Sequence, residues 1–213
     1  MKYYLFDFDG TLVDSMPTYG AMMLRILEES NVSYPANILK IITPLGFKGT
    51  AKYYREELGH PLSEEALLEK MRRYAYEAYA TSIPAKPNVA RVLAELKARG
   101  AALSVLTASP HVTLDVCLER LGLTQYFDNI WSCDDFATTK ADPAIYRMAA
   151  ERMGTSVENV LFLDDNCNAD KTAKEAGMRV CGVFDPSSAE YEEEMRALCD
   201  FYIRDFEELT SIS

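Results

Sequence analysis

Two pairs of aspartates, each placed directly after a short apolar run, are the residues of this sequence best suited to do chemistry. Asp7 and Asp9 follow one such run near the start of the chain, and Asp164 and Asp165 follow another. Carboxylates held this close repel one another, and either a divalent cation or a shared proton relieves that repulsion. Sets of carboxylate oxygens are the ligands that Mg²⁺ prefers in proteins.

Each pair also has a purely structural interpretation. The first could be a capped turn with one stray acid, because Gly10 permits a sharp turn and Thr11 can hydrogen-bond within it. In the second, Asp165 or Asn166 could simply be the N-cap of the following helix. A cap requires only one such residue, however, and both pairs end runs typical of buried parallel strands, where open α/β sheets bind their ligands. We therefore favour a metal site.

A segment that carries hydroxyl groups is the third candidate. Thr107, Ala108 and Ser109 end a further apolar run and precede Pro110, which is predicted to begin a helix. Hydroxyl donors and the free N–H groups of a helix N-terminus can bind a phosphate. A Ser or Thr in this position is also a common helix cap, so the pattern is weak when taken alone.

Lys140 is the fourth candidate, placed after the third predicted strand of the core and just before another helix. A lone lysine is usually a solvated surface charge. The formal net charge of −11, however, repels anionic substrates at long range, so a phosphate site in this chain needs local positive charge. The position of Lys140 near the same edge of the sheet favours that use.

The elements that would position these residues alternate between strand and helix. Short apolar runs suited to buried parallel strands are followed by segments with helical spacing that end at glycine. This alternation predicts an α/β fold, a Rossmann-like three-layer core with a central parallel sheet. The predicted strands are residues 3–8, 102–107, 129–132, 160–164 and 180–184, and the later helices are residues 87–99, 110–121, 142–153 and 169–176.

Residues 15–85 break the alternation, because they contain helical patterns only. We expect an all-helical cap domain here, inserted into a catalytic core made of residues 1–14 and 86–213. Its predicted helices are residues 16–30, 36–41, 48–58 and 64–81. Within the cap, residues 44–50 could form a substrate loop in which Lys48 meets an anionic group, or a plain turn between two helices.

Composition limits the class of protein. Of the 213 residues, 48% are apolar and 26% charged, as in an ordinary globular protein. The acidic balance argues against nucleic acid and anionic membranes as partners. The cysteines are odd in number and form no CxxC pair, and no secretory signal precedes them, so we expect reduced thiols in a cytoplasmic protein. We expect a monomer or a weak dimer.

Together the four candidates resemble the haloacid dehalogenase superfamily, in the branch with a helical cap that includes phosphoglycolate phosphatases and β-phosphoglucomutases. The run DFDGTLVDS at residues 7–15 is similar to the family's first motif, DxDGTLxDS. Thr107 and Lys140 match the second and third motifs, and Asp164-Asp165 with Asp170 matches the fourth. The third motif commonly reads Lys-Pro and the fourth Gly-Asp, so the chain departs from the usual pattern there without losing a functional group.

The resemblance implies a Mg²⁺-dependent phosphatase for a small phosphorylated metabolite. Asp7 would attack phosphorus to form an aspartyl-phosphate, and Asp9 would protonate the leaving oxygen and later deprotonate water. Asp7, the backbone carbonyl of Asp9 and Asp165 would hold the metal, with Asp164 close by. Lys140 would neutralise charge, and Thr107, with the adjoining residues 108–109, would bind the phosphoryl oxygens.

Three other functions are compatible with parts of this pattern. Dehalogenases of the superfamily lack the second aspartate, so Asp9 argues for phosphoryl chemistry. A β-phosphoglucomutase-like phosphotransferase shares all four motifs, but it would require a second phosphate site, for which no clear basic cluster is visible. A non-catalytic binding protein of the same fold would be expected to lose catalytic positions, and none is lost here.

Overall fold

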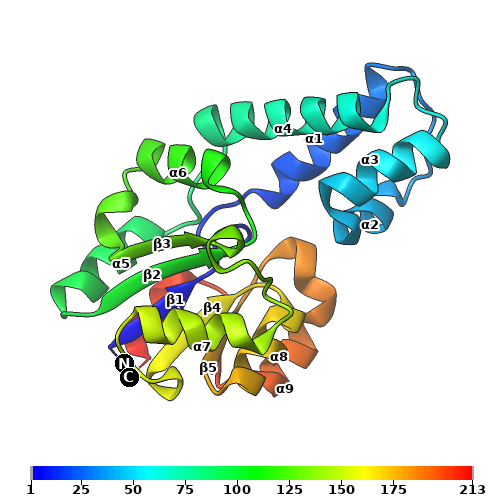
Figure 1. Cartoon of the computed structure of the whole chain (residues 1–213). Coiled ribbons are helices and arrows are strands. Elements are labelled where there is room, and N and C mark those ends of the chain that lie inside the picture. Colours follow the sequence, from blue (N-terminus) through cyan, green and yellow to red (C-terminus); the bar gives the residue numbers. More distant parts are fainter. Residues whose placement is uncertain (1, 213) are drawn as a thin grey trace. The chain divides into compact units, whose positions relative to one another are not determined.

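The computed structural model describes residues 2–212, which form two compact units. One unit combines the described residues up to Ser15 with those from Ile83 onward, and the other is Met16–Ser82. Figure 1 shows the course of the chain through both. No helix among the described residues is both long and apolar enough to cross a membrane.

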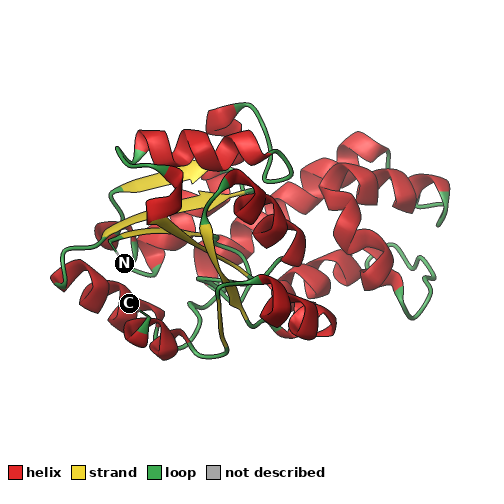
Figure 2. Cartoon of the chain, turned by 90° about the horizontal axis from the view of Figure 1, so that it is seen from below, coloured by secondary structure: helices red, strands yellow, loops and turns green. Residues whose placement is uncertain are grey.

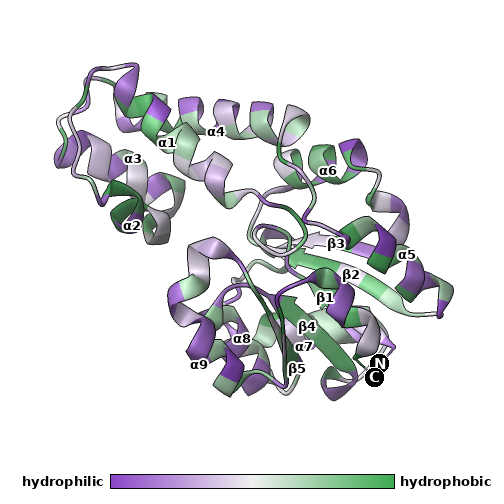
Figure 3. Cartoon of the chain, turned by 180° about the vertical axis from the view of Figure 1, so that it is seen from behind, coloured by the Kyte–Doolittle hydropathy of each residue, from purple (hydrophilic) through white to green (hydrophobic). Residues whose placement is uncertain are grey.

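The first unit is built on a six-stranded sheet with the strand order β3-β2-β1-β4-β5-β6, in which every neighbouring pair is parallel. Its strands are short and apolar, and Figure 3 shows β2 and β4 in hydrophobic colours. The predicted parallel α/β core is therefore confirmed. The strands are β1 (Tyr3–Phe6), β2 (Ala102–Thr107), β3 (Asn129–Ser132), β4 (Val160–Asp164), β5 (Arg179–Val183) and β6 (Phe201–Ile203).

Helices cover both faces of this sheet, as the view in Figure 2 shows. The connection between two parallel strands is right-handed. Connections that lead toward β3 on one side of β1 therefore place their helices on one face, and those that lead toward β6 on the other side place theirs on the opposite face. One buried cluster accordingly joins residues of β1, β2, β4 and β5 to the two helices that flank β4 in the chain. The helices are α5 (Val89–Ala98), α6 (His111–Arg120), α7 (Pro143–Arg152), α8 (Cys167–Ala176) and α9 (Glu192–Leu198).

The second unit consists of helices, inserted in the chain between β1 and α5. The hydroxyl of Tyr54, a fully buried side chain, donates to the carbonyl of Met23 at 3.0 Å and so ties two of the helices together. Ser63 caps the longest helix by accepting from the N–H of Ala66. The helices are α1 (Met16–Glu28), α2 (Ile38–Ile42), α3 (Gly46–Glu56) and α4 (Glu64–Thr81).

Besides shifts of one or two residues at other element ends, two features of the sheet differ from the sequence prediction. Strand β1 ends at Phe6 and not at residue 8, because the Phe8 carbonyl accepts from the N–H groups of Leu12 and Val13 and closes a tight turn. Strand β6 was missed altogether. It has three residues and lies at the edge of the sheet, so its sequence is too short to show a periodic pattern.

Phe6 tests how strongly the core depends on β1. Its fully buried ring lies about 6 Å, centroid to centroid, from the rings of Tyr4, Phe127 and Phe206. We expect Phe6→Ala to lower the free energy of unfolding by about 4 kcal/mol, since a cavity replaces the ring. Urea denaturation measures this, with Val112→Ala, at a residue 62% exposed, as the control that should change little. Equal losses in the two variants would contradict the prediction.

Candidate active site

Three buried carboxylates and one ammonium group meet at the carboxyl ends of β1 and β4. Oxygen atoms of Asp7, Asp164 and Asp165 all lie within 4.8 Å of one another. The Nζ of Lys140 hydrogen-bonds Asp7 Oδ1 and lies 2.8 Å from Asp164 Oδ2. The structure therefore brings together four of the residues that the sequence suggested, from three separate segments of the chain.

Strand order explains why these carboxylates meet. In this sheet the chain runs outward from β1 to β2 and β3, then crosses back to place β4 on the other side of β1. Neighbouring strands at such a switch point diverge beyond their carboxyl ends, and open α/β sheets bind ligands there. Phe6 pairs with Leu163, and the N–H of Asp7 donates to the Leu163 carbonyl at 2.8 Å, so Asp7 and Asp164 leave the sheet at the same level.

The turn after β1 fits closely around Asp165. Gly10 has φ +77°, and a Cβ added at this position would collide with the Asp165 carboxylate. The Thr11 hydroxyl donates to Asp165 Oδ1 at 3.2 Å and does not serve the turn itself, as the sequence had suggested. Asn166, and not Asp165, accepts the N-cap hydrogen bonds of α8. Neither Asp164 nor Asp165 is therefore needed to cap this helix.

Lys140 is not a solvated surface charge. Tyr146 of α7 fixes its loop, because the Tyr146 hydroxyl contacts the carbonyls of both Lys140 and Ala169 at 3.1 Å. The same tyrosine ring packs edge-on against Phe162, with centroids 5.0 Å apart. Asp142 accepts from the N–H of Ala144 and begins α7 directly after the lysine segment. The lysine is thus held by the core and directed at the carboxylates.

Burial and like charge dominate the electrostatics of this group. Burial raises the pKa of Asp7 to about 7, against the opposing effect of the Lys140 ammonium, and Asp164 and Asp9 raise it further. Burial also raises the pKa of Asp165, with Asp164 and Asp7 adding to the effect. For Lys140, burial disfavours the charge, but the carboxylates of Asp164 and Asp7 outweigh it and raise the pKa.

The side chain of Asp9 lies outside this three-carboxylate group. Its Oδ2 accepts a hydrogen bond of 2.5 Å from the Ser109 hydroxyl, at the end of the neighbouring strand β2. Thr107 is buried, and its Oγ1 accepts from the N–H of Ser109 at 3.1 Å, which leaves the Thr107 hydroxyl hydrogen available to an acceptor. No side chain caps α6, so neither residue is merely a helix cap. Ala108 is exposed between them.

Lys48 and Asp170, which the sequence also suggested, lie elsewhere, and so does His111. Lys48 is exposed in the first turn of α3, so its segment is helical and not a loop. Asp170 is fully buried in α8 but does not join the three-carboxylate group; its Oδ2 accepts from the Cys199 thiol at 3.3 Å. His111 contacts the carboxylates of Asp115 and Asp135 through its two ring nitrogens, at 3.0 and 2.9 Å.

Sequence reasoning missed an ion pair between Lys86 and Asp185. The Lys86 ammonium lies 2.8 Å from Asp185 Oδ2 and donates to the Phe184 carbonyl at 2.9 Å. Both charges act on Asp165, Asp185 raising and Lys86 lowering its pKa. Asp164 is the last residue of β4 and Asp185 lies two residues beyond β5, so the rule that acids at strand ends mark the site could have found Asp185. Nothing in the sequence pairs Lys86 with it.

The carboxylate group suits a hard divalent cation. Its donors are oxygen atoms only, close together and buried, with one ammonium against three carboxylates. A divalent cation would balance the remaining charge and relieve the repulsion that raises the carboxyl pKa values. Asp7, Asp164 and Asp165 therefore fit Mg²⁺.

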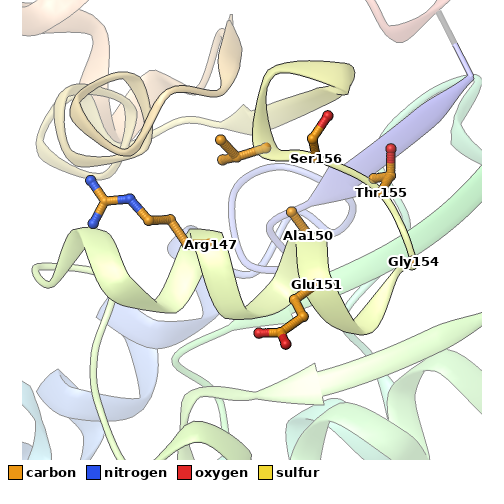
Figure 4. A pocket seen from close by; sticks show the side chains of 7 residues that line it. Arg147, Ala150, Glu151, Gly154, Thr155 and Ser156 are labelled. Carbon is orange, nitrogen blue, oxygen red and sulfur yellow. The ribbon is translucent and has the colours of Figure 1, made fainter.

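An open hollow elsewhere in the first unit contains none of these residues. It has a volume of about 580 Å³ and lies between the end of α7 and the segment that leads to β4 (Figure 4). Arg147, Glu151, Thr155 and Ser156 are among its lining residues, and no carboxylate of the site reaches it. This hollow is therefore separate from the carboxylates at the strand ends.

Known proteins are similar to this chain over most of its length. The model of the haloacid dehalogenase-like hydrolase family matches residues 4–183. Phosphoglycolate phosphatase of Neisseria meningitidis is 30% identical over 184 residues, which cover 84% of this chain and 78% of that protein. Phosphorylated carbohydrates phosphatase of Thermotoga maritima is 28% identical over 193 residues, covering 86% and 85%. The magnesium-bound hydrolase YfnB of Bacillus subtilis has a similar fold, with a TM-score of 0.80, 20% identity and coverage of 99% and 97%.

The Lys86–Asp185 pair leads to a prediction about stability and pH. Burial raises the pKa of Asp185, but hydrogen bonds from Lys86 and Ser187 outweigh burial and lower it. This contribution to stability is present above the pKa of an unfolded aspartate and is lost as pH falls through the folded value. In Lys86→Met the pKa of Asp185 rises, so we expect acid unfolding, followed by circular dichroism, to begin at a higher pH.

At neutral pH the same variant leaves Asp185, 1% exposed, without its cation. We expect it to lower the free energy of unfolding by about 3 kcal/mol. Lys86→Arg keeps the charge and is the matched control. If Lys86→Arg and Lys86→Met shift the acid transition equally, the ion pair is not the cause.

Proposed function

Because this chain belongs to the haloacid dehalogenase-like hydrolases, we propose that it is a magnesium-dependent phosphatase that acts through an aspartyl-phosphate on Asp7. The observation that carries the proposal is the contact of Lys140 with both Asp7 and Asp164 beside Asp165. An ammonium group fixed between two buried carboxylates provides the positive charge that an acidic protein needs in order to accept a phosphate.

In the proposed reaction Asp7 is the nucleophile. Lys140 hydrogen-bonds its Oδ1, so Oδ2 is the oxygen that attacks phosphorus. A bond forms between this oxygen and phosphorus while the bond from phosphorus to the leaving oxygen breaks, and Asp9 gives a proton to that oxygen. Water then attacks phosphorus, the bond to Asp7 breaks, and Asp9 takes a proton from the water. The products are an alcohol and inorganic phosphate.

The other site residues orient the phosphoryl group and balance its charge. Thr107 donates its hydroxyl hydrogen to a phosphoryl oxygen, and the backbone at residues 108–109 completes that contact. Asp7, Asp165, Asp164 and the backbone carbonyl of Asp9 would hold Mg²⁺, which would offset the negative charge of the carboxylates and the phosphate. Magnesium in the similarly folded YfnB supports this choice of ion.

The substrate we propose is a small phosphorylated metabolite, as the printed names of the two relatives suggest for those proteins. We assign the choice among phosphoglycolate, sugar phosphates and nucleotides to the helical unit Met16–Ser82, acting as a cap. Its exposed Lys48 is suited to an anionic group on the substrate. All five cysteines are free thiols in the structure, in keeping with a cytoplasmic enzyme. We expect it to act as a monomer or a weak dimer.

Asp7→Asn tests the nucleophile. With Mg²⁺ and p-nitrophenyl phosphate, and across a panel of phosphorylated metabolites, we expect the variant to lose at least about a thousandfold in kcat/KM, since the covalent step is removed. Acid-quenched wild-type protein should carry phosphate on the peptide that contains Asp7. Asp134→Asn, at an exposed acid in the same unit, is the control. Equal activity of Asp7→Asn and wild type would refute the mechanism.

The panel also separates hydrolysis from phosphoryl transfer. A mutase would convert β-glucose 1-phosphate without net release of phosphate, whereas the proposed enzyme releases phosphate from each substrate that it accepts. Complete absence of both activities in the folded wild-type protein would favour a non-catalytic binding protein.

Removal of divalent metal should abolish activity. We expect EDTA to reduce phosphate release to background and excess Mg²⁺ to restore it, because Asp7 cannot approach an anionic phosphate without added positive charge. Mg²⁺ should also raise the thermal unfolding temperature of wild type, since a ligand that binds only the folded state stabilises it. Asp165→Asn should lose most of that stabilisation. Undiminished activity in EDTA would contradict the metal requirement.

A further inference from the structure

The hydroxyl of Ser109 is hydrogen-bonded to a side chain of the proposed mechanism. Its Oγ donates to Asp9 Oδ2 at 2.5 Å, across a separation of 100 positions in the sequence. Sequence reasoning had given Ser109 to the phosphate, so this contact suggests a different task for its hydroxyl.

The backbone around Ser109 is itself fixed. Its N–H donates to Thr107 Oγ1 at 3.1 Å, and Pro110, with φ −72°, precedes the first residue of α6. Strand β2 lies directly beside β1, with Phe6 paired to Val105, so the segments that carry Asp9 and Ser109 leave adjacent strands. The serine hydroxyl therefore reaches Asp9 from a rigid support and not from a free loop.

We infer that Ser109 is a positioning residue, whose hydroxyl holds Oδ2 of Asp9 and presents Oδ1 to the leaving oxygen. The inference rests on the proposed function. In the first chemical step the proton moves from Asp9 Oδ1 to the leaving oxygen as the bond to phosphorus breaks, and Asp9 becomes a carboxylate. A hydrogen bond to a carboxylate is stronger than one to the neutral acid. The contact therefore strengthens during the step, which lowers its barrier.

The leaving group distinguishes this role from phosphate binding. p-Nitrophenolate is a weak base that leaves without a proton, whereas an alkoxide must be protonated. Loss of a contact to a phosphoryl oxygen would slow the hydrolysis of aryl and alkyl phosphates equally. Loss of the contact to Asp9 would slow the hydrolysis of an alkyl phosphate much more than that of an aryl phosphate. For both substrates kcat/KM reports the first chemical step.

Ser109→Ala is the test variant, assayed with p-nitrophenyl phosphate and with the best alkyl phosphate of the panel. We expect kcat/KM to fall about 10- to 100-fold for the alkyl phosphate, as for the loss of one hydrogen bond to a charged group, and less than about threefold for the aryl phosphate. Ser109→Cys, which keeps a weak donor, should lie between. Ser156→Ala, at an exposed serine of the same unit, should change neither.

A double-mutant cycle shows whether the effect acts through Asp9. In an Asp9→Ala background, Ser109→Ala should add no loss that depends on the leaving group. Equal losses for the two substrates, or an unchanged selective loss in that background, would overturn the inference. Either result leaves the proposed function standing, whereas an inactive wild-type protein would defeat the proposed function itself. Thermal unfolding of each variant verifies that it is folded.

Discussion

Three buried carboxylates lie together, only two of them in contact with an ammonium group, and the surrounding structure holds them against their mutual repulsion. Like charges in a low dielectric repel strongly, so Asp7, Asp164 and Asp165 could not stay together on a flexible support. Parallel pairing of β1 with β4 sets the first two at one level, and Gly10 leaves room for the third. The Tyr146 hydroxyl fixes the loop that brings in Lys140. Each of these contacts contributes less energy than the repulsion between the carboxylates, so the arrangement of the carboxylates depends on all of the contacts together.

Much of this arrangement could be predicted from the sequence, because one topological rule covers most of it. Side chains that directly follow parallel strands gather at one edge of the sheet, so the apolar runs before Asp7, Thr107 and Asp164 place these residues near one another without further information. The same runs, alternating with helices that end at glycine, predicted the parallel core. Lys140 required more, since a lysine in a loop has no periodic signal, and the resemblance to the family supplied its role.

The remaining features depend on contacts between segments that no local pattern links. Strand β6 forms because β5 offers it an edge, and Lys86 meets Asp185 only after the chain has returned from the helical unit. The segment around Lys48 contains two glycines and a proline, which fit either a substrate loop or a plain turn, yet α3 begins at Gly46, two residues before the predicted start. Thr11 looked like a turn residue, but the fold places Asp165 within reach of its hydroxyl. The partners in β6, the Lys86–Asp185 pair and the Thr11–Asp165 contact are far apart in the sequence, so local patterns could not reveal them.

The aspartates of the site are not equivalent, and their hydrogen bonds explain how one residue type can serve several roles. Asp164 uses Oδ2 for Lys140 and Oδ1 for the N–H of Asn166, so it chiefly holds other groups in place. In Asp7 the lysine engages only Oδ1, which suits the proposed nucleophile. Asp9 is held differently again, because its Oδ2 accepts a hydrogen bond from the Ser109 hydroxyl, in the segment that follows β2. Residues of one type thus take different roles according to the groups that their oxygens contact.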